Sequence, residues 1–128
     1  MRLLLDTCSF LWIVAGAKEL SKSARDAFRD PANDVFLSAA SAWEIALKHQ
    51  LGRLPLPEPP EAFVPKQRKA HGVERLDIDE EAALHVAKLP PLHRDPFDRM
   101  LVAQALVAGL VLLTPDDSIR QYLARTFW

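Results

Sequence analysis

Three short apolar runs, each followed within a few residues by a hydroxyl or acidic side chain, are the clearest pattern along the chain. They are Leu3–Leu5, Val35–Leu37 and Leu110–Leu113. Apolar runs of this length without alternating polar positions are typical of strands buried on both faces of a parallel sheet. We therefore predict strands at these positions, the second extending over residues 34–38, and a short edge strand at 73–76.

The segments between the predicted strands carry helix signals. We predict helices at 7–14, 21–29, 39–50, 61–70, 79–88, 95–108 and 118–124, with Pro65 as a candidate break and residues 54–60 as a proline-rich extended connector. Asp95-Pro96 is a strong start signal, because Asp caps a helix and Pro suits its first turn, and Gly109 is a C-terminal stop. Alternating strands and helices predict the α/β class, with a central parallel sheet covered on both faces.

Composition limits the remaining choices. The 128 residues suffice for one domain, so we expect a single domain spanning residues 1–128. Sixteen basic and seventeen acidic residues nearly cancel, which excludes nucleic-acid binding through bulk charge. Cys8 is the only cysteine, no apolar run is long enough for a membrane span, and Asp6 comes too early for a signal peptide. We expect a cytoplasmic protein with no membrane partner.

Acidic residues follow the predicted strands in a way that brings them together. Asp6 ends the first strand, and Asp116 and Asp117 follow the last. Glu44 and Asp98 are expected in the first turns of helices that start at the same edge. Ligands of open parallel sheets bind beyond the carboxyl ends of the strands, so four carboxylates from four segments are aimed at one place.

Such a cluster needs a compensating positive charge. Two carboxylates about 5 Å apart repel by roughly 3 kcal/mol at an effective dielectric near 20. All-oxygen ligands suit Mg²⁺ or Mn²⁺. Zinc fits poorly, because the four histidines are scattered along the chain and Cys8 has no cysteine partner. We predict a divalent metal site.

Most of these acids also have a structural interpretation. Ser41 and Glu44 match a capping box, Asp95 is best explained as a helix cap, and one of Asp116 and Asp117 must cap the last helix. Asp6, directly after three leucines, is the hardest to explain structurally, because burying a charge is costly. The convergence of the acids, and no single residue, carries the prediction.

Four motifs in one order give the chain a resemblance to a known family. They are Leu4-Leu5-Asp6-Thr7, Ser41-Ala42-Trp43-Glu44-Ile45-Ala46-Leu47-Lys48, the segment from His93 to Ala105, and Leu113-Thr114-Pro115-Asp116. Together they resemble the PIN-domain ribonucleases, and in particular the VapC-type toxins of toxin–antitoxin pairs. The resemblance covers essentially the whole chain. It implies a three-layer α/β/α sandwich, Mg²⁺- or Mn²⁺-dependent cleavage of RNA, a homodimer and a small cognate antitoxin as partner.

The resemblance also assigns residues. It implies that Asp6, Glu44 and Asp98 are the main catalytic and metal-binding acids, with Asp116 a more variable fourth. The residues expected to bind substrate or support the site are Thr7, Ser41, Arg94, Asp95, Arg99, Thr114 and Asp117. Cys8 departs from the polar residue often found there, and the adjacent Asp117 leaves open which acid of the last pair faces the metal.

Two alternatives remain beside the nuclease. Haloacid-dehalogenase-like phosphatases also begin with a strand running into Asp, but they need a second Asp two residues later, where this chain has Cys8. The other is a PIN-like domain that only binds RNA or protein. Lys48, Arg94 and Arg99 are candidates for phosphate contacts, with solvated charges or internal ion pairs as the alternative.

A metal-dependent mechanism leads to specific expectations for variants and cleavage products. Alanine at Asp6, Glu44 or Asp98 should abolish cleavage, alanine at His93 should be tolerated, and the products should carry a 5′-phosphate and a 3′-hydroxyl. We also expect the dimer to bury apolar surface from the region between Leu51 and Val64, or from helices near it.

Overall fold

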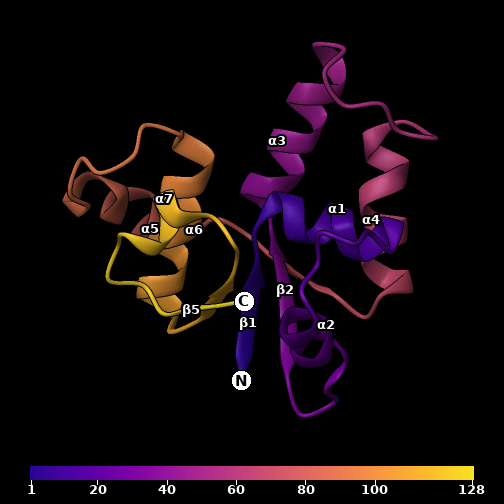
Figure 1. The fold of residues 1–128 in the computed structure, drawn as a ribbon. Coiled ribbons are helices and arrows are strands. Elements are labelled where there is room, and N and C mark those ends of the chain that lie inside the picture. Colours follow the sequence, from indigo (N-terminus) through magenta and orange to yellow (C-terminus); the bar gives the residue numbers. More distant parts are fainter.

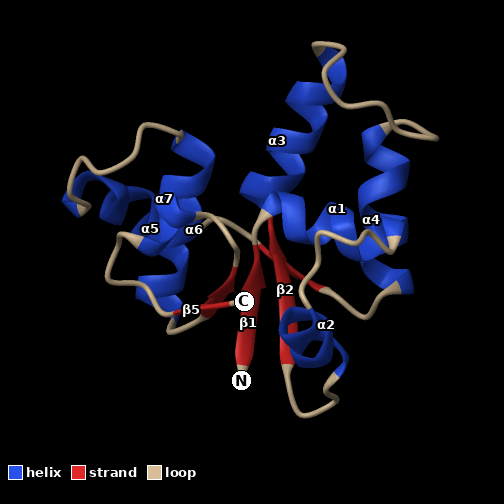
Figure 2. Cartoon of the chain, viewed as in Figure 1, coloured by secondary structure: helices blue, strands red, loops and turns tan.

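The computed structural model describes residues 1–128 and contains one parallel sheet between two layers of helices (Figures 1 and 2). Its strands are β1 (Arg2–Leu5), β2 (Asp34–Ser38), β3 (Glu74–Leu76), β4 (Val111–Leu113) and β5 (Thr126–Phe127). Their order across the sheet is β3-β2-β1-β4-β5, and every neighbouring pair is parallel. The predicted α/β/α sandwich with a central parallel sheet is confirmed.

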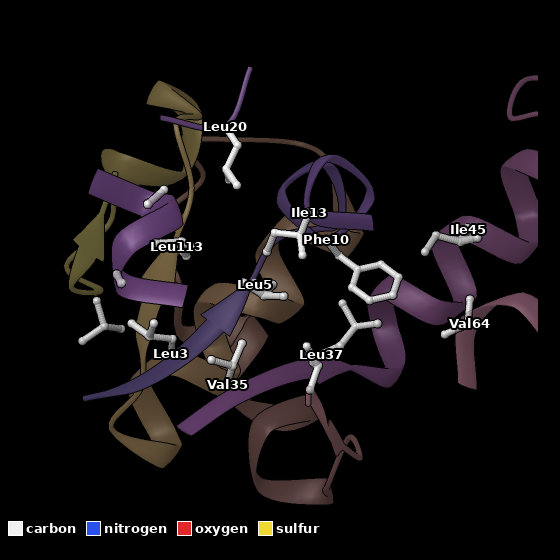
Figure 3. Close-up of a cluster of buried hydrophobic side chains, with 14 of the residues drawn as sticks. Leu3, Leu5, Phe10, Ile13, Leu20, Val35, Leu37, Ile45, Val64 and Leu113 are labelled. Atoms are coloured by element: carbon white, nitrogen blue, oxygen red, sulfur yellow. The ribbon is translucent and has the colours of Figure 1, made fainter. Parts of the chain in front are cut away.

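The three leucines of β1 supply both faces of the sheet. Leu3 and Leu5 belong to one buried cluster and Leu4 to another, because successive side chains of a strand point to opposite faces. The helices that pack on the Leu3 and Leu5 face are α1 (Thr7–Ala15), α2 (Lys22–Arg29) and α4 (Pro60–Ala70). Figure 3 shows the side chains that fill this cluster. Both faces of the sheet are therefore buried, as the continuous apolar runs predict.

The Leu4 face is covered by the C-terminal helices. α6 (Pro96–Ala108) and α7 (Asp117–Arg120) contribute buried side chains to this cluster, and α5 (Glu80–His85) and the 3₁₀ turn η1 (Val86–Lys88) pack against α6. α3 (Ala39–Gln50) leaves the end of β2 directly and packs against α1, α4 and α6 (Figure 1). It therefore lies across the carboxyl edge of the sheet.

Local capping explains where the helices begin and end. Asp6, Ser21, Asp79 and Asp95 each accept a hydrogen bond from a backbone N–H in the first turn of the helix that follows. Gly109 ends α6 in the left-handed region, with φ +68°, a conformation that side chains with a Cβ disfavour.

Several predicted boundaries need correction. Pro65 lies inside a continuous α4, and residues 79–88 divide into α5 and η1. The last helix stops at Arg120, not near Ala124, and the chain then turns back so that β5, which we did not predict, pairs with β4. A helix continued to Ala124 would carry Thr126 away from the sheet edge. None of the helices combines the length and apolar character that a membrane span requires.

Candidate active site

A cavity of about 390 Å³ lies at the carboxyl edge of the sheet and is lined by five carboxylates. They come from the ends of two strands and from two helices: Asp6, Glu44, Asp95, Asp98 and Asp116. The remaining lining residues are Thr7, Cys8, Leu11, Lys48, Arg53 and Leu54. The four acids expected to converge therefore share one cavity.

Asp6 is nearly buried and has a complete set of donors. Its Oδ1 accepts from the Ser9 N–H at 2.9 Å, which caps α1, and from the Cys8 thiol at 3.4 Å. Its Oδ2 accepts from the Thr114 hydroxyl at 2.5 Å. With only 3% of the residue exposed, these bonds replace the water that burial removes. Asp6, the acid that is hardest to explain structurally from the sequence, also has a structural role, because it starts α1 as well as lining the cavity.

Thr114 connects Asp6 to the last acid. Its hydroxyl accepts from the Asp116 N–H at 3.0 Å while donating to Asp6. The Asp116 carboxylate caps α7 through the Ser118 N–H at 2.8 Å. The neighbouring Asp117 has a side chain that is 97% exposed and faces Arg120 at 3.9 Å. Asp116, and not Asp117, is the acid of this pair that lines the cavity.

Glu44 lies in the second turn of α3, where we had expected the first. Its Oε1 accepts from the Thr7 hydroxyl at 2.6 Å, and its Oε2 is paired with Lys48. The pKa of Lys48 is raised, chiefly because its ammonium group is hydrogen-bonded to Glu44. The carboxylate is thus held in place by one hydroxyl and one ammonium group.

The capping-box interpretation of Ser41 and Glu44 is wrong. Ser38 caps α3 by accepting from the Ala40 N–H at 3.0 Å, and the bonds to Glu44 come from side chains. Ser41, expected to support the site, is buried on α3, does not line the cavity and has no hydrogen-bond partner.

Asp98 is the acid of the cavity whose pKa departs clearly from its ordinary value. Burial raises its pKa to about 6, and the negative charges of Asp95, Glu44 and Asp116 add to the rise, against a hydrogen bond from His93 that lowers it. The His93 Nε2 lies 2.9 Å from Asp98 Oδ2. Burial and the neighbouring carboxylates together therefore disfavour a further negative charge in the cavity.

His93 is a site residue that the sequence did not reveal. We had grouped it with three scattered histidines, but ligand atoms of His93, Asp98 and Asp116 lie within 4.8 Å of one another. The signal available was its position five residues before Asp98, just ahead of the Asp95-Pro96 helix start. Only the conformation of the connecting loop brings the imidazole back onto the helix.

Cys8 is an unreactive neighbour of the site. Burial raises the pKa of its thiol far above the ordinary range, and the adjacent Asp6 carboxylate raises it further. The thiol therefore stays protonated at neutral pH and donates weakly to Asp6. As a protonated thiol it is a poor nucleophile at neutral pH.

The basic residues around the cavity differ from expectation. Arg94 is exposed, as a substrate-binding cation would be. Arg53, which we did not single out, is exposed and lines the cavity. Arg99 is engaged within the protein, since its guanidinium donates to the Tyr122 hydroxyl and to four backbone carbonyls, those of Val86, Leu89, Pro90 and His93.

We therefore expect Arg99→Ala to act on stability. Losing charged donors to several carbonyls should lower the free energy of unfolding by about 2–4 kcal/mol, as measured by urea titration. Arg94→Ala should change it by less than about 0.5 kcal/mol, because Arg94 is exposed. Equal stability of the two variants would contradict the structural role of Arg99.

The donor set fits a hard divalent cation. The cavity offers carboxylate oxygens from separate elements, with one imidazole at its side. A cation bound beside Asp98 would relieve the repulsion among the acids.

The fold and the site together define an α/β protein with an acidic cavity at the carboxyl edge of a parallel sheet. The PIN domain model matches residues 3–123, and the chain belongs to the PIN domain family. The chain is 39% identical over 69 residues to Ribonuclease VapC16 of Mycobacterium tuberculosis, a match that covers 54% of this chain and 49% of that protein. The chain thus spans about half the length of this curated relative.

Solved structures with the same fold are complexes of VapBC type. VapBC2 from Rickettsia felis, bound to a DNA fragment from its promoter, gives a TM-score of 0.72 at 12% identity over 99% of this chain and 98% of that chain. DNA-bound VapBC from Salmonella typhimurium gives 0.70 at 17% identity, over 99% and 97%. VapBC-1 from nontypeable Haemophilus influenzae gives 0.66 at 18% identity, over 99% and 97%. At these identities the likeness establishes the fold, and the resemblance seen in the sequence is confirmed for family and fold.

Proposed function

We propose that the chain is a metal-dependent endoribonuclease, the toxin of a VapC-type toxin–antitoxin pair. The observation that carries this proposal is the convergence of Asp6, Glu44, Asp98 and Asp116 in one cavity, with the pKa of Asp98 raised to about 6. The name of the relative, Ribonuclease VapC16, supports RNA as the substrate.

Asp6, Glu44, Asp98 and Asp116 would hold Mg²⁺ or Mn²⁺. A bound ion of this kind supplies Lewis acidity and the positive charge that phosphodiester hydrolysis needs. Thr114 fixes the Asp6 carboxylate, while Thr7 and Lys48 fix that of Glu44. Held this way, Glu44 faces the cavity and can orient or deprotonate an attacking water molecule.

Exposed cations are positioned to hold the RNA backbone. Arg53 lines the cavity itself, and Arg94 directly precedes the capping Asp95. Neither makes an ion pair within the protein, so both guanidinium groups are free to contact phosphates. Local contacts of this kind are what a nearly neutral chain needs to bind a polyanion.

Incubation of the purified protein with total RNA in Mg²⁺, Mn²⁺ or EDTA tests the proposal. We expect cleavage only with a divalent metal, leaving 5′-phosphate and 3′-hydroxyl ends, because water and not the 2′-hydroxyl attacks phosphorus. Cleavage in EDTA, or 2′,3′-cyclic phosphate ends, would contradict the metal mechanism. RNA that is bound but never cut would favour the binding-module alternative.

A small antitoxin and a second copy of the chain are the proposed protein partners. The structures with this fold are of VapBC, which supports the antitoxin. The apolar patch we expected at the dimer interface is smaller than supposed, because Phe63 is buried in the core, Leu54 and Leu56 pack against it, and only Leu51 is exposed. Sedimentation velocity at micromolar concentration tests the dimer, and a monomer would contradict it.

A further inference from the structure

Trp43 is the one tryptophan of the chain that faces outward. It is 62% exposed, whereas Trp12 and Trp128 are partly buried and pack against each other with ring centroids 5.8 Å apart. A tryptophan side chain is normally largely buried, because its large apolar surface is costly to leave in water. Its exposure on a well-formed helix makes it available to contact a ligand.

The position of Trp43 ties it to the acidic cavity. It directly precedes Glu44 on α3, and its ring contacts Phe97, which directly precedes Asp98 on α6. The centroids of the two rings are 4.9 Å apart, with the planes at 76°. Two neighbouring helices thus each present an aromatic ring and a cavity acid at consecutive positions. We name Trp43 and Phe97 the aromatic pair.

The exposed face of the Trp43 indole is available for stacking against another planar ring. An edge-to-face contact uses at most one face of either ring, so at least one face of Trp43 remains open. Three of its four neighbours one turn away on α3 are alanines, Ala39, Ala40 and Ala46, which are too short to cover a ring. Phe97 holds the indole from one side and leaves the other free.

We propose that Trp43 stacks against a base of single-stranded RNA next to the phosphate that the acidic cavity cleaves. This inference rests on the proposed nuclease function and adds a residue that contacts the substrate beside the cleaved phosphate. In a duplex the bases are stacked on one another, and only an unpaired base offers its face to a side chain. Stacking also supplies affinity without bulk positive charge, which suits a chain of net charge −1.

Binding and kinetics with matched variants test the proposal. Trp43→Leu keeps an apolar side chain but removes stacking, and Trp43→Phe keeps a smaller ring. Leu84→Ala, at an exposed apolar position of α5, is the control. The probe is a fluorescein-labelled single-stranded RNA of mixed sequence, bound in EDTA and cleaved with Mn²⁺, beside its duplex form.

We expect Trp43→Leu to raise the Kd and the KM for the single strand by about 5- to 100-fold, with a smaller change in kcat, and Trp43→Phe to fall between. Leu84→Ala should bind like the wild type, and binding of the duplex should be weak and unchanged in every variant. Binding of the single strand should also quench the tryptophan fluorescence of the wild type, and the part of this quenching that comes from Trp43 should be absent in Trp43→Phe.

The possible outcomes distinguish the stacking role of Trp43 from the proposed nuclease function. Normal cleavage with an unchanged KM in Trp43→Leu would overturn the stacking role and leave the nuclease standing. Stacking in EDTA without cleavage in metal would overturn the nuclease and leave the stacking site. Loss of a dimer in Trp43→Leu, with RNA binding intact, would show that a second copy of the chain covers Trp43 and would overturn the inference.

Discussion

Replacing Asp6 with Asn should lower the rate of RNA cleavage by about a thousandfold or more, without unfolding the protein. Metal ions supply several kcal/mol of charge stabilisation in such reactions, and each 1.4 kcal/mol is about tenfold in rate. Asn caps a helix about as well as Asp, so α1 should still begin after residue 6. The change keeps an oxygen that can cap α1 and removes the negative charge, together with the bond that Asp6 Oδ2 accepts from Thr114.

The same experiment contains its own control. Glu44→Gln and Asp98→Asn should show comparable losses, because both carboxylates line the cavity. Asp117→Asn, which removes the same charge from a side chain that is 97% exposed, should retain nearly full activity. Steady-state cleavage of a labelled RNA in Mn²⁺, with circular dichroism to verify folding, measures both. If Asp117→Asn were as damaging as Asp6→Asn, the assignment of the cavity as the active site would be wrong.

Asp98→Asn should stabilise the protein at pH 8 when divalent metal is removed with EDTA. In the folded protein the pKa of Asp98 is about 6, above its ordinary value of 3.8. The folded state therefore binds more protons than the unfolded state between pH 4 and 6, and stability falls as pH rises through this window. The native state should lose about 2–3 kcal/mol in this way, and Asn avoids the loss.

Thermal unfolding at two pH values measures this effect. At pH 8 the melting temperature of Asp98→Asn should exceed that of the wild type by about 5–15 °C, and at pH 4 the two should nearly coincide. Adding Mn²⁺ at pH 8 should raise the melting temperature of the wild type and close most of the gap. A difference between the proteins that is the same at both pH values would contradict the raised pKa of Asp98.

The parts of the fold that the sequence predicted well are those with local causes. The α6 helix starts at Asp95-Pro96 and stops at Gly109 because these residues have strong intrinsic preferences at helix ends. The convergence of Asp6 and Asp116 followed from a topological rule, since parallel strands place their carboxyl ends at one edge.

The missed features depend on contacts between distant segments. His93 reaches Asp98 through a loop that Arg99 fixes by its bonds to Val86, Leu89 and Pro90, and no local signal specifies such a loop. β5 exists because Thr126 and Phe127 meet the free edge of β4. Phe63 lies on a helix that the sequence predicted, but its local sequence does not show that this position packs on the core. Each of these three features depends on tertiary contacts that the local sequence does not show.

The central position of β1 in the sheet has a consequence for folding during synthesis. β1 lies between β2 and β4, and Leu3 pairs with Val35 on one side and Val111 on the other. A nascent chain that has not reached residue 111 leaves one edge of this apolar strand unpaired, and it also lacks Thr114 and Asp116 at the cavity. Contacts so distant in sequence form late and slowly. The cavity of the proposed nuclease is therefore complete only after residue 116 has left the ribosome, and chains that terminate before residue 111 should be both unfolded and unable to cleave RNA.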